Sequence, residues 1–481
     1  MSVTDLLDTA EAGPAAIRGG LVRVGGFVVG TLVGVASFAI LARHLGVRDI
    51  GRYSVVVALV TVVGGLTDLG LTAIGVRELS VRKGVERTHF ARNLLGLRLA
   101  LGVAGGIAMV GFAALAGYGV TLVQGVALGA VGLLLQSWQS TLSIPLMSEL
   151  RLGWVAIVDL SRSVLNGVLV LVLVLADASL LPFLAVTIPV GIIILALNAL
   201  IVRGTRALLP AFHAADWRTL FGDVLPYAAA TAAAAVYFQL AVIIVSLIAD
   251  ATAVGYFGVS SRVVQILLVI PGLAVGAAFP IFARAARDDR ERLAYALGRV
   301  FEVSLLVGVL ISIMLALGAP IVIRLVGGPE FSKASSLLSI QAIGLAASFV
   351  GAVWSYGLLS LGRSGDILRI NLLALVIGGA SVAVLVKIDG AEGAAIGTAA
   401  GEMVLALLSA RALTRVDRRL MPPFRIVPAV ALGAGLAILI PLAGFPVLVS
   451  CVVAGAVYVS VVVALRAVPR ELWEQLPRRS V

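Results

Sequence analysis

The stretch Gly255–Pro280 reads GYFGVSSRVVQILLVIPGLAVGAAFP and decides what kind of protein this chain is. As an α-helix it is long enough to cross the hydrocarbon core of a bilayer, which is roughly 30 Å thick. It nevertheless carries Arg262, about 10 Å from one end. A charge in hydrocarbon costs at least ~2.5 kcal/mol, so such an arginine faces a polar cavity, pairs with an acid or reaches back to the surface. The stretch predicts a membrane span with one charge to account for.

The whole chain has the composition of a membrane protein with many spans. Of its 481 residues, 60% are apolar and 13% are charged, whereas about a quarter charged is usual in soluble domains. The lone cysteine, Cys451, excludes a disulfide within the chain and a thiolate metal cluster. The net charge of +11 lies mainly in short loops, so it indicates membrane topology and not nucleic-acid binding. Residues 1–20 contain Asp5, Asp8 and Glu11 and lack a basic start, so we expect no secretory signal.

Apolar runs of about 18 to 25 residues predict an all-α polytopic membrane protein with fourteen spans. The expected spans are 21–42, 54–76, 93–117, 120–144, 154–176, 180–202, 224–249, 254–281, 300–325, 335–360, 367–388, 392–413, 426–444 and 447–466. The loops provide an independent test of this count. Odd-numbered loops hold six Lys and Arg residues, whereas the termini and even-numbered loops hold twenty-seven. The positive-inside rule therefore predicts that both termini are cytoplasmic.

Two short patterns recur and predict a duplicated fold. The tripeptide GRY at 51–53 returns loosely as GYF at 255–257, and the pattern D-x-x-R at 159–162 returns at 366–369, offsets of 204 and 207 residues. Both offsets fit a period of six spans, so we expect two parallel six-helix lobes around a central cavity. The expected parts are a cytoplasmic segment 1–20, an N-lobe 21–203, a cytoplasmic linker 204–223, a C-lobe 224–413, two extra spans in 426–466 and a cytoplasmic tail 467–481.

No motif of a soluble enzyme is present. His44, His89 and His213 lie in loops too far apart in sequence to predict a metal site. The glycine-rich stretch 390–395 lacks the lysine and the strand-loop-helix context of a phosphate-binding loop, so it indicates close helix packing. We therefore expect no enzymatic activity, no metal and no cofactor. Coupling to the membrane potential, H+ or Na+ stays open.

Polar side chains within the spans are the candidate functional residues. They are Asp68, Arg98, Gln136, Gln139, Asp159, Arg162, Asn166, Gln239, Arg262, Gln265, Glu302, Gln341, Asn371 and Glu402. Their simplest role is hydrogen bonding between helices or snorkelling to the membrane surface. Pro226 and Pro271 also lie within spans, where each can act as a hinge or as a static kink.

Arg262 is the strongest candidate, because apolar and small residues follow it for three turns and Gln265 lies one turn away on the same face. A cationic face that also carries an amide suits a phosphate or pyrophosphate. Arg18 and Arg23, at the mouth of the first span, either receive a phosphate from the cytoplasmic leaflet or anchor the helix. The predicted cavity set is Arg262, Gln265, Arg23, Gln239, Asp68 and Arg98.

A series of short motifs follows a familiar order along the chain. They are Leu41–Gly46 with Gly51-Arg52-Tyr53, Asp68–Leu71 with Arg77-Glu78, Gly255-Tyr256 with Arg262, Pro271 and Phe279-Pro280, Gly327-x-x-x-Phe331, and Gly393-Ala394-Ala395 before Glu402. In this order, over almost its whole length, the chain resembles the polysaccharide-transporter branch of the multidrug/oligosaccharidyl-lipid/polysaccharide exporter superfamily.

The resemblance implies a V-shaped bundle of two six-helix lobes, with fourteen helices in all, in the bacterial inner membrane. Such proteins flip undecaprenyl-pyrophosphate-linked oligosaccharides to the outer leaflet, and polysaccharide polymerases or ligases are candidate partners. In the related lipid II flippases, cavity arginines near the starts of helices 1 and 8 are thought to engage the pyrophosphate, and Arg23 and Arg262 occupy roughly matching places. The motifs match the lipid II branch more loosely than the O-antigen or exopolysaccharide flippases, so the glycan stays open.

Two other functions compete with a flippase. A multidrug or cation antiporter of the same superfamily needs acidic residues within its lobes, and Asp68 and Glu402 keep that alternative open. A membrane glycosyltransferase or ligase needs an acidic base or a large outer loop, and Asp250 in a short loop is a poor candidate. At the offset of 204 residues Arg262 corresponds to Ala58, so the expected cationic site belongs to one half only.

Overall fold

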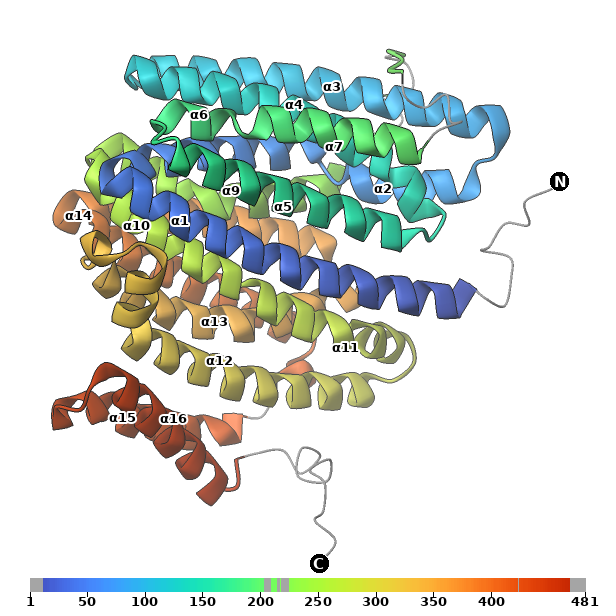
Figure 1. Cartoon of the computed structure of the whole chain (residues 1–481). Helices are drawn as coiled ribbons and strands as arrows, with labels where there is room; N and C mark the ends of the chain where they lie inside the picture. The colour runs from blue at the N-terminus through green and yellow to red at the C-terminus, as the bar shows by residue number, and fades with distance from the viewer. Residues whose placement is uncertain (1–11, 203–208, 214–216, 218–224, 423, 468–481) are drawn as a thin grey trace, which may run out of the picture. The chain divides into compact units, whose positions relative to one another are not determined.

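The computed structural model describes residues 12–202, 209–213, 217, 225–422 and 424–467, and helices make up nearly all of this part of the chain (Figure 1). No strand occurs among the described residues, so the all-α class is confirmed. Eleven of the described helical stretches are long and apolar enough to cross a membrane, as expected for a polytopic membrane protein. The count of fourteen spans and the cytoplasmic placement of the termini remain predictions.

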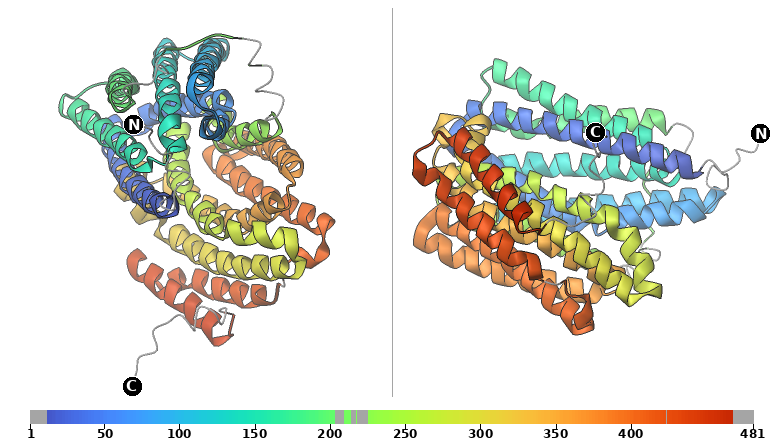
Figure 2. Two further views of the ribbon diagram at one scale, coloured as in Figure 1. Left: turned by 90° about the vertical axis from the view of Figure 1, so that its right-hand side faces the viewer. Right: turned by 90° about the horizontal axis from the view of Figure 1, so that it is seen from below.

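The chain divides into two compact units, Met1–Gln239 (unit 1) and Leu240–Val481 (unit 2), within each of which the helices run side by side (Figure 2). Unit 1 contains α1 (Ala12–Asp68), α2 (Leu71–Val81), α3 (Gly84–Leu115), α4 (Val120–Ser148), α5 (Leu152–Leu175), α6 (Leu180–Ala185), α7 (Thr187–Ile201) and most of α9 (Leu225–Ile248). Helix α1 has 57 residues with a non-helical break at Gly46. A straight helix of that length would measure about 85 Å, so α1 is long enough for two crossings.

Unit 2 is also built from long helices. After the end of α9 it contains α10 (Ala251–Leu267), α11 (Val269–Asp288), α12 (Arg290–Val326), α13 (Ala334–Ser360), α14 (Ser364–Val416), α15 (Val427–Leu439) and α16 (Val447–Ala464). Short 3₁₀ turns lie at Pro329–Phe331, Arg418–Leu420, Phe424–Ile426 and Ile440–Ala443. Helix α14 has 53 residues and breaks at Asp389 and Gly390. The expected lobe and linker boundaries remain predictions.

Three expected spans are interrupted, and each interruption has a local cause. The span expected at 54–76 breaks after Asp68, where Leu69 and Gly70 have φ angles of 43° and 69°. The span expected at 180–202 breaks after Ala185, because Pro189 has no N–H to donate to the Ala185 carbonyl. The span expected at 254–281 breaks after Leu267 for the same reason, since Pro271 lies four residues later.

Small residues allow α13 and α14 to pack closely in unit 2. A Cβ atom added at Gly344 would lie 2.9 Å from the Cα of Ala399, and one added at Gly351 would lie 3.3 Å from the Cα of Ala406. Polar contacts follow the same seam, because the Ser348 hydroxyl donates to Glu402 over 2.5 Å. This combination of small residues and hydroxyl hydrogen bonds is the usual way in which helices associate without help from water.

The C-terminal helices of unit 2 are attached to α12. The Tyr458 hydroxyl on α16 donates to the Leu306 carbonyl over 3.0 Å. Nearby, the buried Glu302 accepts a hydrogen bond from Arg299 at 2.7 Å and lies 3.6 Å from the Nε of Arg425. Glu302 therefore links α12 to the segment that leads into α15.

Candidate functional site

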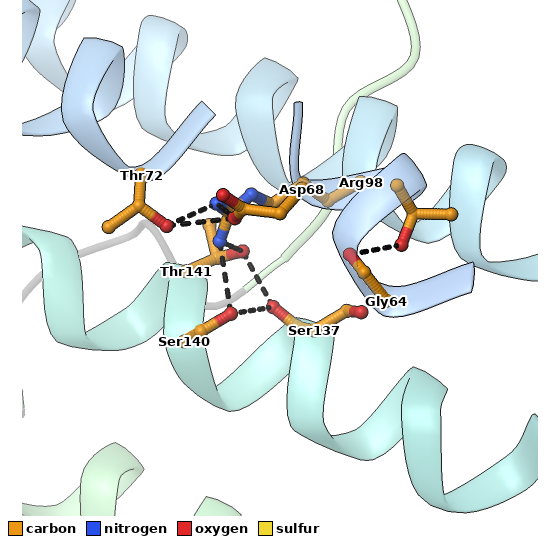
Figure 3. Close-up of polar contacts among 8 residues, drawn as sticks. Gly64, Asp68, Thr72, Arg98, Ser137, Ser140 and Thr141 are labelled. Atoms are coloured by element: carbon orange, nitrogen blue, oxygen red, sulfur yellow. Dashed lines mark hydrogen bonds and ion pairs between the residues drawn. The ribbon is translucent and has the colours of Figure 1, made fainter. Parts of the chain in front are cut away.

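A network of polar side chains lies at the C-terminal end of α1, after the break at Gly46 (Figure 3). Asp68 is the last residue of α1, and the left-handed backbone at Leu69 and Gly70 separates it from α2. Thr72, in the first turn of α2, donates its hydroxyl to Asp68 Oδ1 over 2.9 Å. The interruption thus sets a carboxylate and a hydroxyl side by side within what would otherwise be one continuous apolar helix.

Arg98, in the middle of α3, forms the centre of this network. Its Nη2 donates to Asp68 Oδ1 and, over 2.6 Å, to the Thr72 hydroxyl. Its Nη1 donates to the hydroxyls of Ser140 and Thr141 on α4, over 3.0 and 3.3 Å. These two hydroxyls in turn donate to the carbonyl of Ser137, as Figure 3 shows. Four side chains from three helices therefore fix the guanidinium in position.

The two charges of the network differ in their access to solvent. The Arg98 side chain is 2% exposed, whereas the Asp68 side chain is 43% exposed. Asp68 uses only Oδ1 in its hydrogen bonds with described residues. Arg98 Nε is buried and has no hydrogen-bond partner among the described residues. The pair therefore presents a partly exposed carboxylate over a buried guanidinium with one unused N–H.

This arrangement can interact with a cation through Asp68 or with an anion through Arg98. An ion pair that neutralises a buried arginine is costly to break on one side only, because an unpaired buried charge remains. The open oxygen of Asp68 can accept a hydrogen bond, a proton or a cation. Arg98 can bind an external anion only when Asp68 moves away from it.

The remaining predicted cavity residues lie elsewhere. Arg262 on α10 is exposed, and Gln265 lies one turn later and is half-buried. Gln239, on α9 in unit 1, is buried. The side chain of Arg23 falls outside the described residues. The structure thus brings Asp68 and Arg98 together in unit 1 and places Arg262 and Gln265 in unit 2, and substrate binding by this set remains a prediction.

Sequence reasoning missed the hydroxyl residues that hold Arg98. Thr72, Ser140 and Thr141 each accept a hydrogen bond from it. Hydroxyls commonly bond to carbonyls of their own helix, so their presence in an apolar run predicts no specific partner. The available signal was the spacing of Thr72 four residues after Asp68, which in the continuous helix expected at 54–76 would place both on one face.

A second polar cluster ties the segment after α7 to α3 within unit 1. Asn93 Oδ1 accepts the backbone N–H of His213 over 3.0 Å and the indole N–H of Trp217 over 2.8 Å. The Ala211 N–H donates to the Arg92 carbonyl over 2.9 Å. A Cβ at Gly96 would lie 1.9 Å from the Ala211 carbonyl oxygen, so only glycine permits this approach. The described residues contain no group of three His, Cys, Asp or Glu side chains that could hold a metal ion.

Comparison with known proteins gives a consistent picture. A family model described as "Polysaccharide biosynthesis protein" matches residues 40–336. No significant match is found among curated proteins. The inward closed structure of the lipid II flippase MurJ is 13% identical, with 94% of this chain and 100% of that chain covered and a TM-score of 0.76.

Multidrug transporters of the MATE family have a similar fold. An inward-facing MATE structure is 16% identical, with 83% of this chain and 98% of that chain covered and a TM-score of 0.66. An outward-facing one is 17% identical, with 87% and 99% covered and a TM-score of 0.59. At these identities the likenesses show the fold, and they do so for transporters of two kinds.

Proposed function

We propose that this chain, which belongs to the polysaccharide biosynthesis protein family within the multidrug/oligosaccharidyl-lipid/polysaccharide exporter superfamily, flips a lipid-linked oligosaccharide across the bacterial plasma membrane. The family match confirms the resemblance that the sequence motifs indicated. The family, the fold and the many apolar helices identify the chain as a membrane transporter of this superfamily. The substrate is the proposal, an oligosaccharide carried on undecaprenyl pyrophosphate.

The observation that carries this proposal is the family match over residues 40–336, which associates the chain with polysaccharide biosynthesis and not with drug export. The likeness to a lipid II flippase supports it, since that fold covers 94% of this chain. Arginines within spans support an anionic head group. Arg98 lies in the middle of α3, and Arg262 lies in α10 with an amide one turn away.

The mechanism that fits these residues is alternating access. In it, the arginines receive the pyrophosphate from the cytoplasmic leaflet while the polyprenyl tail stays in lipid. Rearrangement of the two units then opens the head group to the other side. The proposal does not specify the driving force, for which the candidates are the membrane potential, H+ and Na+. It also does not specify a polymerase or ligase partner.

A multidrug or cation antiporter is the second candidate. It is favoured by the likeness to MATE transporters and by two carboxylates within apolar helices. Asp68 has an open oxygen and is partly exposed, and Glu402 on α14 accepts a hydrogen bond from Ser348. A membrane glycosyltransferase has no comparable support among the described residues.

Reconstitution into liposomes distinguishes these functions. The purified chain should move a fluorescent undecaprenyl-pyrophosphate oligosaccharide between leaflets, and a cationic dye should not be exchanged against a proton or sodium gradient. Arg262→Ala should lose glycan transport, whereas Arg369→Ala should retain it, because the Arg369 side chain is 81% exposed on α14 and the ion pair it makes is with Asp366 on its own helix. Dye exchange without glycan movement would establish the antiporter and overturn the flippase.

A further inference from the structure

The guanidinium of Arg98 has one edge that its present partners fill only in part. An arginine presents five N–H donors in a planar fork, and the Nε and Nη2 donors together form the side that best matches two oxygens of one anion. In this structure Nη2 donates to Asp68 Oδ1, whereas Nε has no hydrogen-bond partner among the described residues. The carboxylate therefore binds through one oxygen where two could be used.

The other edge of Arg98 is fixed by the protein. Ser140 and Thr141 on α4 accept from Nη1, and both are anchored to the Ser137 carbonyl. None of these hydroxyls carries a charge, so they hold the guanidinium in place without neutralising it. The only carboxylate that pairs with Arg98 is Asp68, among the residues that the structure describes.

We propose that the Nε–Nη2 edge of Arg98 is an anion-binding site that Asp68 occupies when no substrate is bound, and that the pyrophosphate of the lipid-linked glycan displaces Asp68 from it. The inference rests on the proposed function and adds a binding edge and a resident competitor to it. A phosphate group has several oxygens, so it can accept from Nε and Nη2 together and satisfy the donor that Asp68 leaves unused.

Asp68 is placed so that it can leave. It ends α1 at the backbone break, and its side chain is 43% exposed, so helix packing does not enclose the carboxylate. Thr72 is its only other described hydrogen-bond partner. The charge of Arg98 is paired both before and after the exchange, which avoids the large cost of an unpaired buried cation.

The exchange predicts that the affinity for an external anion is limited by Asp68. A site that is free for only a fraction of the time binds its ligand more weakly by that fraction. Replacing Asp68 by Asn removes the competing charge but keeps an oxygen for Thr72 and Arg98. Asp68→Asn should therefore bind inorganic pyrophosphate about tenfold more tightly or better, since hydrogen bonds to charged groups are the stronger class.

The experiment measures pyrophosphate binding to the purified full chain in nanodiscs by titration calorimetry. The matched control is Asp49→Asn, because Asp49 pairs with Arg52 over 2.9 Å within the same helix and lies outside the network. The control should bind pyrophosphate as the unaltered chain does. The gain in Asp68→Asn should disappear in the double variant Asp68→Asn with Arg98→Gln, which assigns it to Arg98.

A second variant covers failure of Asp68→Asn to fold. Thr72→Val removes the hydroxyl that contacts both Asp68 and Arg98, so it should also increase the affinity, by a smaller factor. Unchanged or weaker binding in whichever of these variants is folded would overturn the proposal. Inorganic pyrophosphate has no lipid and no sugar, so its binding reports on the site alone. Pyrophosphate binding as predicted, without movement of a lipid-linked oligosaccharide, would overturn the proposed function and leave this site standing.

Discussion

Replacing Asn93 by Ala should loosen the attachment of Leu209–His213 and Trp217 to α3. Asn93 is buried, and its side-chain oxygen accepts from both His213 and Trp217, more than a hundred residues later. Trp217 also packs against the apolar cluster that contains Leu71, Leu79 and Phe90. The asparagine therefore adds to the other contacts that hold Leu209–His213 on α3, namely the hydrogen bonds with Arg92 and the ring contact between His89 and His213.

The size of the effect follows mainly from the two short hydrogen bonds at 3.0 and 2.8 Å, because the third, from Asn93 Nδ2 to the His213 carbonyl, is long at 3.5 Å. A typical hydrogen bond contributes about 1 kcal/mol net, so losing both costs about 2 kcal/mol of docking free energy. At 1.4 kcal/mol per factor of ten, the open population of the segment should rise about thirtyfold. The hydrogen bonds of Arg92 with Ala211 and Leu209 are present with or without Asn93, so they do not change this ratio.

Hydrogen–deuterium exchange read by mass spectrometry measures this directly. Peptides that cover Leu209–His213 should exchange about thirtyfold faster in Asn93→Ala, while peptides from the middle of α3 should be unaffected. Asn166→Ala is the matched control, because Asn166 is a half-buried asparagine on α5 and is not part of the cluster. Equal exchange of the segment in Asn93→Ala and the unaltered chain would show that Asn93 does not hold it.

Three further predictions test the packing and the network by the effect of substitutions on the free energy of unfolding. Asp68→Ala should lower it by about 3–5 kcal/mol, because Arg98 is left buried and unpaired; Arg98→Met should cost less, since the Asp68 side chain left behind is 43% exposed and not buried. Gly344→Ala should cost about 1–3 kcal/mol by forcing α13 and α14 apart, whereas Gly435→Ala, with nothing within 4 Å, should change little. Arg425→Ala should cost less than about 1 kcal/mol, because its side chain is 65% exposed and its contact with Glu302 spans 3.6 Å; a loss as large as that of Asp68→Ala would show that the pair is more than a surface contact.

Much of the fold could be predicted from the sequence because membrane spans are defined by composition. The apolar runs locate the described helices well, and the glycine-rich stretch 390–395 fits the expectation of close packing, because a Cβ at Gly393 would lie 2.0 Å from the Leu385 carbonyl oxygen across the break in α14. The interruption at Leu69 and Gly70 could not be predicted in the same way. The apolar run continues through it, and hydropathy does not report that two successive residues adopt left-handed backbone.

The two charged residues of the candidate site were predictable from the sequence, but their arrangement and their hydroxyl partners were not. Asp68 and Arg98 stand out in the sequence as charges within spans, but they are 30 residues apart on different helices. Their pairing depends on where α1 ends and on how α2 turns, which hydropathy does not show. We expected Arg98 to line the cavity as a free cation. In the structure it is paired with the Asp68 carboxylate, and its role in substrate binding remains a prediction.

The duplication that the sequence indicates gives Arg98 a counterpart in the other unit. Glu302 lies 204 residues later, at the same offset that relates 51–53 to 255–257. Both side chains are buried, on α3 and on α12, which hold the same place in the order of helices. Arg98 is neutralised by Asp68 from the preceding broken helix, whereas Glu302 is neutralised by Arg299 on its own helix and by Arg425. If the predicted repeat relates these two positions, both carry a buried charge but of opposite sign, so the Glu302 position does not offer the guanidinium that Arg98 offers.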